Sequence, residues 1–291
     1  MTTTEDLKQL VKEKYSEIAD QSMDQNKASC CGGTCGCATI DEGIMAEDYS
    51  NLKGYEANAD LGLGCGLPTE LAKIKEGDVV VDLGSGAGND AFVARAIAGP
   101  SGKVIGVDFT ERMIEKAREN AEKLGYNNVE FRYGDIEKLP LTSSVADVVV
   151  SNCVMNLVPD KAKAFGETFR ILKPGGHFSI SDIVLVGELP NGLRTNAEMY
   201  VGCVAGAIQK DAYLQTIKDS GFANIQIQKN KKISIPEEIL SAYLSDEELK
   251  NAKRDESGIF SITVYAEKPM EQKKTKQEEK AECCGADSTC C

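Results

Sequence analysis

The sequence predicts an α/β fold built on a mostly parallel sheet with an antiparallel edge, and two observations support this prediction. The first is VVVDLGSGAGND at residues 79–90, where a valine run typical of a buried parallel strand enters a glycine-rich turn. A helix is expected over residues 91–98, so the turn lies at a helix N-terminus. The second is that strand-like and helix-like segments alternate up to residue 185, as expected when helices cover both faces of a parallel sheet.

The glycine spacing of this turn indicates its class of ligand. Gly84, Gly86 and Gly88 form the pattern G-x-G-x-G, whereas the third glycine of the dinucleotide fingerprint would fall at Asn89. The pattern resembles motif I of the class I S-adenosylmethionine (SAM) methyltransferases. Asp108 ends the next expected strand, where a carboxylate can accept hydrogen bonds from both ribose hydroxyls. An ordinary packing turn is the alternative, and the position of Asp108 disfavours it.

The remaining elements follow from apolar periodicity and turn residues. Helices are expected over residues 5–19, 69–74, 159–172 and 211–220, and one more between Thr110, its predicted cap, and Gly125. Strands are expected over residues 103–107, 129–133, 146–151, 178–185, 225–235 and 261–266, the last two antiparallel. The predicted regions are an N-terminal helix, cysteine-rich loop and substrate-site segment (1–76), a SAM-binding core (77–186), a lid segment with a smaller C-terminal α/β part (187–269) and a disordered tail (270–291).

Composition restricts the partners. The formal net charge of −13 argues against nucleic acid or an anionic membrane, because phosphate binding needs basic patches. No apolar run reaches the length of a membrane span, and the first ten residues lack the apolar region of a signal peptide. We therefore expect a cytoplasmic protein.

Cysteine usage is the unusual feature of this chain. Of the eleven cysteines, four lie within residues 30–37 and four within residues 283–291. In a reducing compartment such clusters indicate metal binding or thiol chemistry more often than disulfides. The first cluster, C-C-x3-C-x-C, differs from the paired spacing of a zinc ribbon and suits a soft, thiophilic ion better. A flexible loop without a ligand is the alternative. The single histidine, His177, is expected to be structural.

Three isolated cysteines remain. Cys65 lies between two glycines ahead of the first sheet strand, which favours an exposed and reactive thiol over the usual buried one. Cys153 follows the fourth strand, at the sheet edge where open α/β folds bind their ligands. Cys203 lies in residues 188–208, a segment that breaks the strand–helix rhythm and is a candidate substrate lid.

With these three cysteines in their surrounding sequences, the chain resembles the arsenite SAM methyltransferases over residues 49–260. The resemblance rests on GLGCG around Cys65, VVVDLGSGAGND, VIGVDFT, SNCVMNL around Cys153 and GCVAG around Cys203. It implies a Rossmann-like class I methyltransferase that acts in arsenic detoxification. It also implies that these three cysteines bind arsenic(III), with Cys153 and Cys203 holding it during methyl transfer.

The resemblance also predicts the cofactor site and the co-substrate. Asp108 would bind the ribose of SAM, and Asp135 would accept from the adenine amino group. The full predicted set is Asp82, Gly84, Ser85, Gly86, Gly88, Asp108, Phe109, Met113, Gly134, Asp135, Ile136 and Asn152. A thiol reductant, thioredoxin or glutathione, is the expected co-substrate. Many relatives carry a further N-terminal cysteine that pairs with the equivalent of Cys65; the candidates here, which are also auxiliary arsenic-capture thiols, are Cys30, Cys31, Cys35 and Cys37.

The chemistry is consistent with this composition. Arsenic(III) is soft and prefers thiolates, and its lone pair can attack a sulfonium methyl without loss of a proton. No general base is therefore needed in a chain with one histidine. Two alternatives stay open: a generic SAM-dependent C- or O-methyltransferase of small molecules, and a non-enzymatic thiol protein that sequesters metalloids. The number of methyl transfers and the oligomeric state do not follow from the sequence.

Overall fold

The computed structural model describes residues 4–20, 47–188, 206–234 and 257–270. Predictions for the loop at residues 30–37, for Cys203 and most of the expected lid, and for the tail lie outside these ranges. The strands are β1 (Val79–Leu83), β2 (Lys103–Asp108), β3 (Val129–Tyr133), β4 (Ala146–Asn152), β5 (Leu172–Val186), β6 (Ala223–Lys232) and β7 (Gly258–Glu267). The helices are α1 (Thr4–Ala19), α3 (Pro68–Leu71), α4 (Asn89–Ala98), α5 (Glu111–Lys123), α6 (Lys161–Ile171) and α8 (Lys210–Asp219), with a 3-10 turn η1 (Met155–Leu157).

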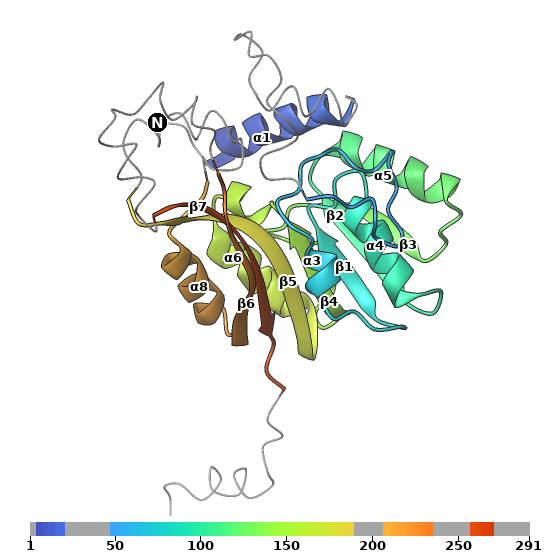
Figure 1. Ribbon diagram of the computed structural model, residues 1–291. Helices are drawn as coiled ribbons and strands as arrows, with labels where there is room; N and C mark the ends of the chain where they lie inside the picture. The colour runs from blue at the N-terminus through green and yellow to red at the C-terminus, as the bar shows by residue number, and fades with distance from the viewer. Residues whose placement is uncertain (1–3, 21–46, 189–205, 235–256, 271–291) are drawn as a thin grey trace, which may run out of the picture.

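Within these ranges the strands form one sheet in the order β3-β2-β1-β4-β5-β7-β6 (Figure 1). Strands β1 to β5 are parallel, and β7 runs antiparallel to both β5 and β6. The predicted α/β class, with a mostly parallel sheet and an antiparallel edge, is confirmed. The boundaries of the four predicted regions stay a prediction, although β6 and β7 complete the same sheet.

Each face of the sheet has its own apolar core, because successive side chains of a strand point to opposite faces. Val80 and Val104 belong to a core that includes side chains of α4 and α5. Val81 and Ile105 belong to the other core, which includes side chains of α6 and α8. The helices therefore cover both faces, and the carboxyl ends of the strands meet along one edge. Among the described helices, none has the length and apolarity of a membrane span.

The start of β5 differs from the prediction. The sequence predicts a helix up to residue 172 and a strand only from residue 178, but β5 begins at Leu172. The Gly175 N–H donates to the carbonyl of Lys268 at 2.9 Å, and the Lys268 N–H donates to Gly176 at 2.8 Å. This pairing extends β5 through a sequence that looks like a turn. The pairing of β5 with β4 has a register shift between Ala146 and Val148.

Several other boundaries were predicted imperfectly. Helix α3 ends at Leu71 rather than at residue 74, and Lys73 adopts a left-handed conformation that no helix continues through. Thr110 occupies the N-cap of α5, but its side chain makes no capping hydrogen bond. Asp160 does cap α6, since its carboxylate accepts from the Lys163 N–H at 3.0 Å. The terminal strands differ too: β6 starts earlier than predicted and ends at Lys232, and β7 extends further at both ends.

His177 makes structural contacts, as expected. Its Nε2 lies 2.7 Å from the carbonyl oxygen of Ala72, and its ring packs on Tyr265 with centroids 5.1 Å apart. These contacts tie the end of α3 to the antiparallel edge of the sheet.

Gly88 provides a test of how the glycine turn packs. Its φ is +102°, and an added Cβ would lie 2.8 Å from the ring of Phe92 and 2.9 Å from that of Phe131. Gly125 also has a positive φ, but an added Cβ there meets nothing within 4 Å. Gly88→Ala should therefore lose about 1–3 kcal/mol more of the free energy of unfolding than Gly125→Ala, measured in urea. Equal losses would show that only the backbone conformation matters at residue 88.

Candidate active site

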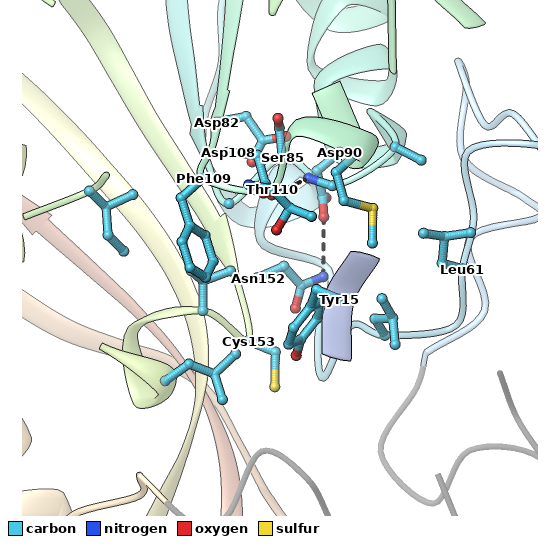
Figure 2. Close-up of a pocket in the computed structure, with 18 of the residues that line it drawn as sticks. Tyr15, Leu61, Asp82, Ser85, Asp90, Asp108, Phe109, Thr110, Asn152 and Cys153 are labelled. Atoms are coloured by element: carbon cyan, nitrogen blue, oxygen red, sulfur yellow. Dashed lines mark hydrogen bonds between the residues drawn. The ribbon is translucent and has the colours of Figure 1, made fainter. Parts of the chain in front are cut away.

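A pocket opens at the carboxyl ends of β1 to β4, where the glycine turn and the loops after the next strands meet (Figure 2). Helix α1 contributes Lys8, Val11 and Tyr15 to its wall. All of the sequence-predicted cofactor residues except Gly88 line it, namely Asp82, Gly84, Ser85, Gly86, Asp108, Phe109, Met113, Gly134, Asp135, Ile136 and Asn152. Gly88 instead packs beneath the turn, against the two phenylalanine rings described above.

The glycine turn brings the loops after β1 and β4 into contact. Gly84 has a φ of +69°, and any Cβ there would collide with the side chain of Val154. Gly86, with a φ of +50°, donates its N–H to Asp108 Oδ2 at 3.0 Å. The Thr110 N–H donates to Asp108 Oδ1 at 2.8 Å. Asp108 is thus fixed by the backbone at the end of β2, while each of its oxygens keeps a lone pair for a ligand.

Carboxylates dominate the electrostatics of the pocket. Among the described residues that line it are five aspartates, Asp60, Asp82, Asp90, Asp108 and Asp135, and one cationic side chain, Lys8. Lys8 bonds Asp135 at 2.7 Å and Glu137 at 2.6 Å, so it neutralises the outer rim rather than the centre. The pocket therefore favours a cationic ligand.

Burial raises the pKa values of the three inner aspartates. The pKa of Asp82 is well above its usual value because of desolvation and the nearby charges of Asp90 and Asp108. Desolvation also raises the pKa of Asp90 to about 6, against the opposing hydrogen bonds from Asn152 and Tyr49. The pKa of Asp108 is raised by desolvation too, with backbone N–H bonds opposing the shift.

Asp82 retains an unused hydrogen-bonding group. Its Oδ2 is buried and has no hydrogen-bond partner among the described residues. A buried carboxylate oxygen without a partner is costly, and it fits a ligand that brings an ammonium or hydroxyl donor. Asp135 is different, because its Oδ1 accepts from the Glu137 N–H at 2.9 Å and its Oδ2 pairs with Lys8. A contact from Asp135 to adenine would have to share these oxygens.

Two of the three predicted arsenic ligands lie beside this pocket. Cys153 lines it directly, and Cys65 lies next to Gly64, which also lines it. The expectation of an exposed Cys65 was wrong: Cys65 is 0% exposed and Cys153 is 3% exposed. The glycines beside Cys65 let its loop pack closely instead of leaving it open.

Comparison with known proteins identifies the family. A family model described as a methyltransferase domain matches residues 74–221. An arsenite methyltransferase of Halobacterium salinarum is 38% identical over 277 residues, which are 91% of this chain and 67% of that protein. The chain belongs to the arsenite methyltransferase family. It is therefore a SAM-dependent methyltransferase, as the motifs predicted, and the non-enzymatic alternative falls away.

Further members of the arsenite methyltransferase family agree. That of Aquipseudomonas alcaligenes is 32% identical, covering 81% of this chain and 68% of its own length. The crystal structure of an arsenic(III) SAM methyltransferase from Chlamydomonas reinhardtii is 36% identical, with a TM-score of 0.59, and the match covers 72% of this chain and 69% of that one. The chain thus spans about two thirds of the length of these relatives.

The sequence did not reveal every residue of the site. Tyr49 and Asp90 lie in its wall and hydrogen-bond each other, yet Tyr49 belongs to no periodic segment. Asp90, in the first turn of α4, could have been noticed as an acidic residue inside the glycine motif. Within the described ranges, no group of three His, Cys, Asp or Glu side chains could hold a metal ion. The predicted three-thiolate set is incomplete there because Cys203 lies outside those ranges.

Asp108→Ala should weaken SAM binding by about 1.5–3 kcal/mol, since it removes acceptors from a buried, charge-assisted contact. Isothermal titration calorimetry measures the change. Asp147→Ala is the matched control, because Asp147 hydrogen-bonds the backbone of Val79 at 2.9 Å outside the pocket. Unchanged SAM affinity in Asp108→Ala would remove the ribose assignment.

SAM affinity should also fall on acidification. A bound cation favours ionised carboxylates, so SAM binding releases protons near the Asp90 pKa of about 6. We expect affinity to be about tenfold weaker at about pH 5 than at about pH 7.5. Asp182 has a pKa raised to about 7 by burial but does not line the pocket, so Asp182→Asn should keep this dependence. A flat pH profile in the wild type would contradict the electrostatic description.

Proposed function

We propose that this chain transfers a methyl group from SAM to arsenic(III) held by Cys65, Cys153 and Cys203. The observation that supports this most strongly is that buried Cys153 lines an acidic pocket, while buried Cys65 adjoins Gly64, which lines the same pocket. In Figure 2, Cys153 lies at the far end of the pocket from Asp82 and Asp108, with its sulfur pointing away from them. The proposed cofactor groups and the proposed substrate groups thus occupy opposite ends of one cavity.

The acidic end suits SAM. Asp82 has a free oxygen for the ammonium group of its methionine part, and Asp108 has lone pairs for the ribose hydroxyls. When bound, SAM supplies a methyl group on a positively charged sulfur, which the arsenic lone pair can attack without loss of a proton. The carboxylates of Asp82, Asp90 and Asp108 would attract this positive charge and so favour binding of SAM.

The thiol end suits arsenic(III). Thiolates are soft ligands, and holding arsenic against the cofactor pocket orders two reactants that would otherwise have to meet in solution. Cys203 is the third proposed ligand. Gly206 packs so closely on the carbonyl of Asn156 that a Cβ there would clash. Gly206 lies three residues after Cys203 in the chain, and Asn156 lies three residues after Cys153.

A thiol reductant, thioredoxin or glutathione, is the proposed co-substrate. Donation of the lone pair leaves arsenic two electrons more oxidised, and two thiols can return it to the trivalent state while they are oxidised to a disulfide. The N-terminal cysteines Cys30, Cys31, Cys35 and Cys37 and the tail cluster are proposed as auxiliary capture thiols. A cytoplasmic location, where such reductants are abundant, also stays a prediction.

Substitution of Cys153 tests whether this thiol holds arsenic during the transfer. The protein is incubated with arsenite, SAM and a thiol, and the arsenic species are identified by mass spectrometry. Cys153→Ser is nearly isosteric but presents a hard oxygen, so methylated arsenic should disappear while SAM affinity and thermal stability persist. The matched control converts the tail residues Cys283, Cys284, Cys290 and Cys291 to serine and should keep turnover. Turnover of arsenite near the wild-type rate in Cys153→Ser would refute the assignment.

A further inference from the structure

Asn152, the residue before Cys153, holds the loop of Cys65 by both ends of its side-chain amide. Its Oδ1 accepts the Cys65 N–H at 3.0 Å, and its Nδ2 donates to the Gly66 carbonyl at 2.8 Å. A backbone N–H only donates and a carbonyl only accepts, so the orientation of this amide is fixed by its partners. One side chain therefore links the positions of Cys65 and Cys153.

Tyr49 and Asp90 contact the nitrogen of the same amide. Asn152 Nδ2 lies 2.5 Å from the Tyr49 hydroxyl and 3.2 Å from Asp90 Oδ2, the contact drawn in Figure 2. The Tyr49 hydroxyl is 3.0 Å from each oxygen of Asp90. Tyr49 is 4% exposed and Asp90 is 9% exposed. Water cannot easily replace these buried partners, so loss of one leaves others unsatisfied.

The loop itself is packed too closely to shift without cost. A Cβ on Gly64 would lie 2.6 Å from Asn152 Nδ2, and one on Gly66 would lie 2.5 Å from Ser181 Oγ. The Ser261 hydroxyl donates to the Cys65 carbonyl at 2.5 Å. The two glycines are therefore required by close contact on both sides of Cys65.

We propose that Asn152, fixed by Tyr49 and Asp90, is the positioning residue that places Cys65 against Cys153 and so allows the enzyme to accept inorganic arsenite. This inference rests on the proposed function. Arsenite has three hydroxyls, and each is replaced when a thiol forms an As–S bond, its proton leaving with the hydroxyl as water. A monomethylated trivalent arsenical has only two such positions. Arsenite therefore needs Cys65 in place, whereas the methylated substrate can be held by two thiolates.

The test compares kcat/KM for arsenite and for methylarsenite at saturating SAM. Asn152→Asp is isosteric but replaces the donor with an oxygen that faces the Gly66 carbonyl and Asp90. Tyr49→Phe removes the hydroxyl that Asn152 contacts. In both variants kcat/KM for arsenite should fall relative to kcat/KM for methylarsenite, by about tenfold or more in Asn152→Asp. Cys65→Ser should change this ratio in the same direction. Ser151→Ala, whose buried hydroxyl donates to the Leu83 carbonyl, is the matched control and should keep the wild-type ratio.

A second readout needs no turnover. The rates at which iodoacetamide alkylates Cys65 and Cys153 are measured by peptide mass spectrometry in the absence of arsenic. Asn152→Asp should increase the rate at Cys65 by about tenfold while changing that at Cys153 much less, because the Cys65 loop loses its anchor. An unchanged substrate ratio, or a loss fully explained by weaker SAM binding, would overturn the inference. Wild-type protein that methylates neither arsenical would contradict the proposed function, and the alkylation rates would then decide the positioning claim alone.

Discussion

Three aspartates, Asp82, Asp90 and Asp108, share a buried crevice, and among the described residues the pocket wall around them brings no cation to its centre. Desolvation of like charges is unfavourable, and the protein offsets it only in part. Backbone N–H groups donate hydrogen bonds to Asp108, and the side chains of Asn152 and Tyr49 donate to Asp90. One oxygen of Asp82 has no hydrogen-bond partner in the described structure. A site with this excess of negative charge is prepared for a cationic ligand and unsuited to a phosphate-rich one. The glycine turn and the strand ends provide the space in which that ligand fits.

One of these carboxylates, Asp90, links the acidic end of the pocket to the residue that holds the Cys65 loop. Asp90 accepts from Asn152, and Asn152 in turn receives the Cys65 N–H and precedes Cys153 in the chain. Asp90, Asn152 and the Cys65 loop are therefore parts of one hydrogen-bonded unit. In the proposed reaction the two reacting atoms must be held at a defined separation, and a network of this kind would help to maintain it.

Much of this arrangement could be predicted from the sequence, because local signals and tertiary contacts agree along most of the sheet. Valine-rich strands and the glycine turn were recognisable from composition, and the family motif located Cys153. The start of β5 was not, since residues 173–176 resemble a turn and are made a strand by pairing with Lys268, far along the chain. The burial of Cys65 was also missed. Flanking glycines signal either an open loop or close packing, and only the contacts of Asn152 and Ser181 distinguish the two.

The central claim is that thiolates of this site, and not the terminal cysteine clusters, hold arsenic(III) next to the cofactor pocket. X-ray absorption at the arsenic edge tests it directly by counting sulfur neighbours. The sample is arsenite-loaded protein in which the eight cysteines of residues 30–37 and 283–291 are serine. The account predicts three sulfur neighbours and no oxygen, and two sulfurs with one oxygen when Cys65→Ser is added. Arsenic that keeps an all-oxygen shell in the first sample, or an unchanged shell after Cys65→Ser, would contradict it.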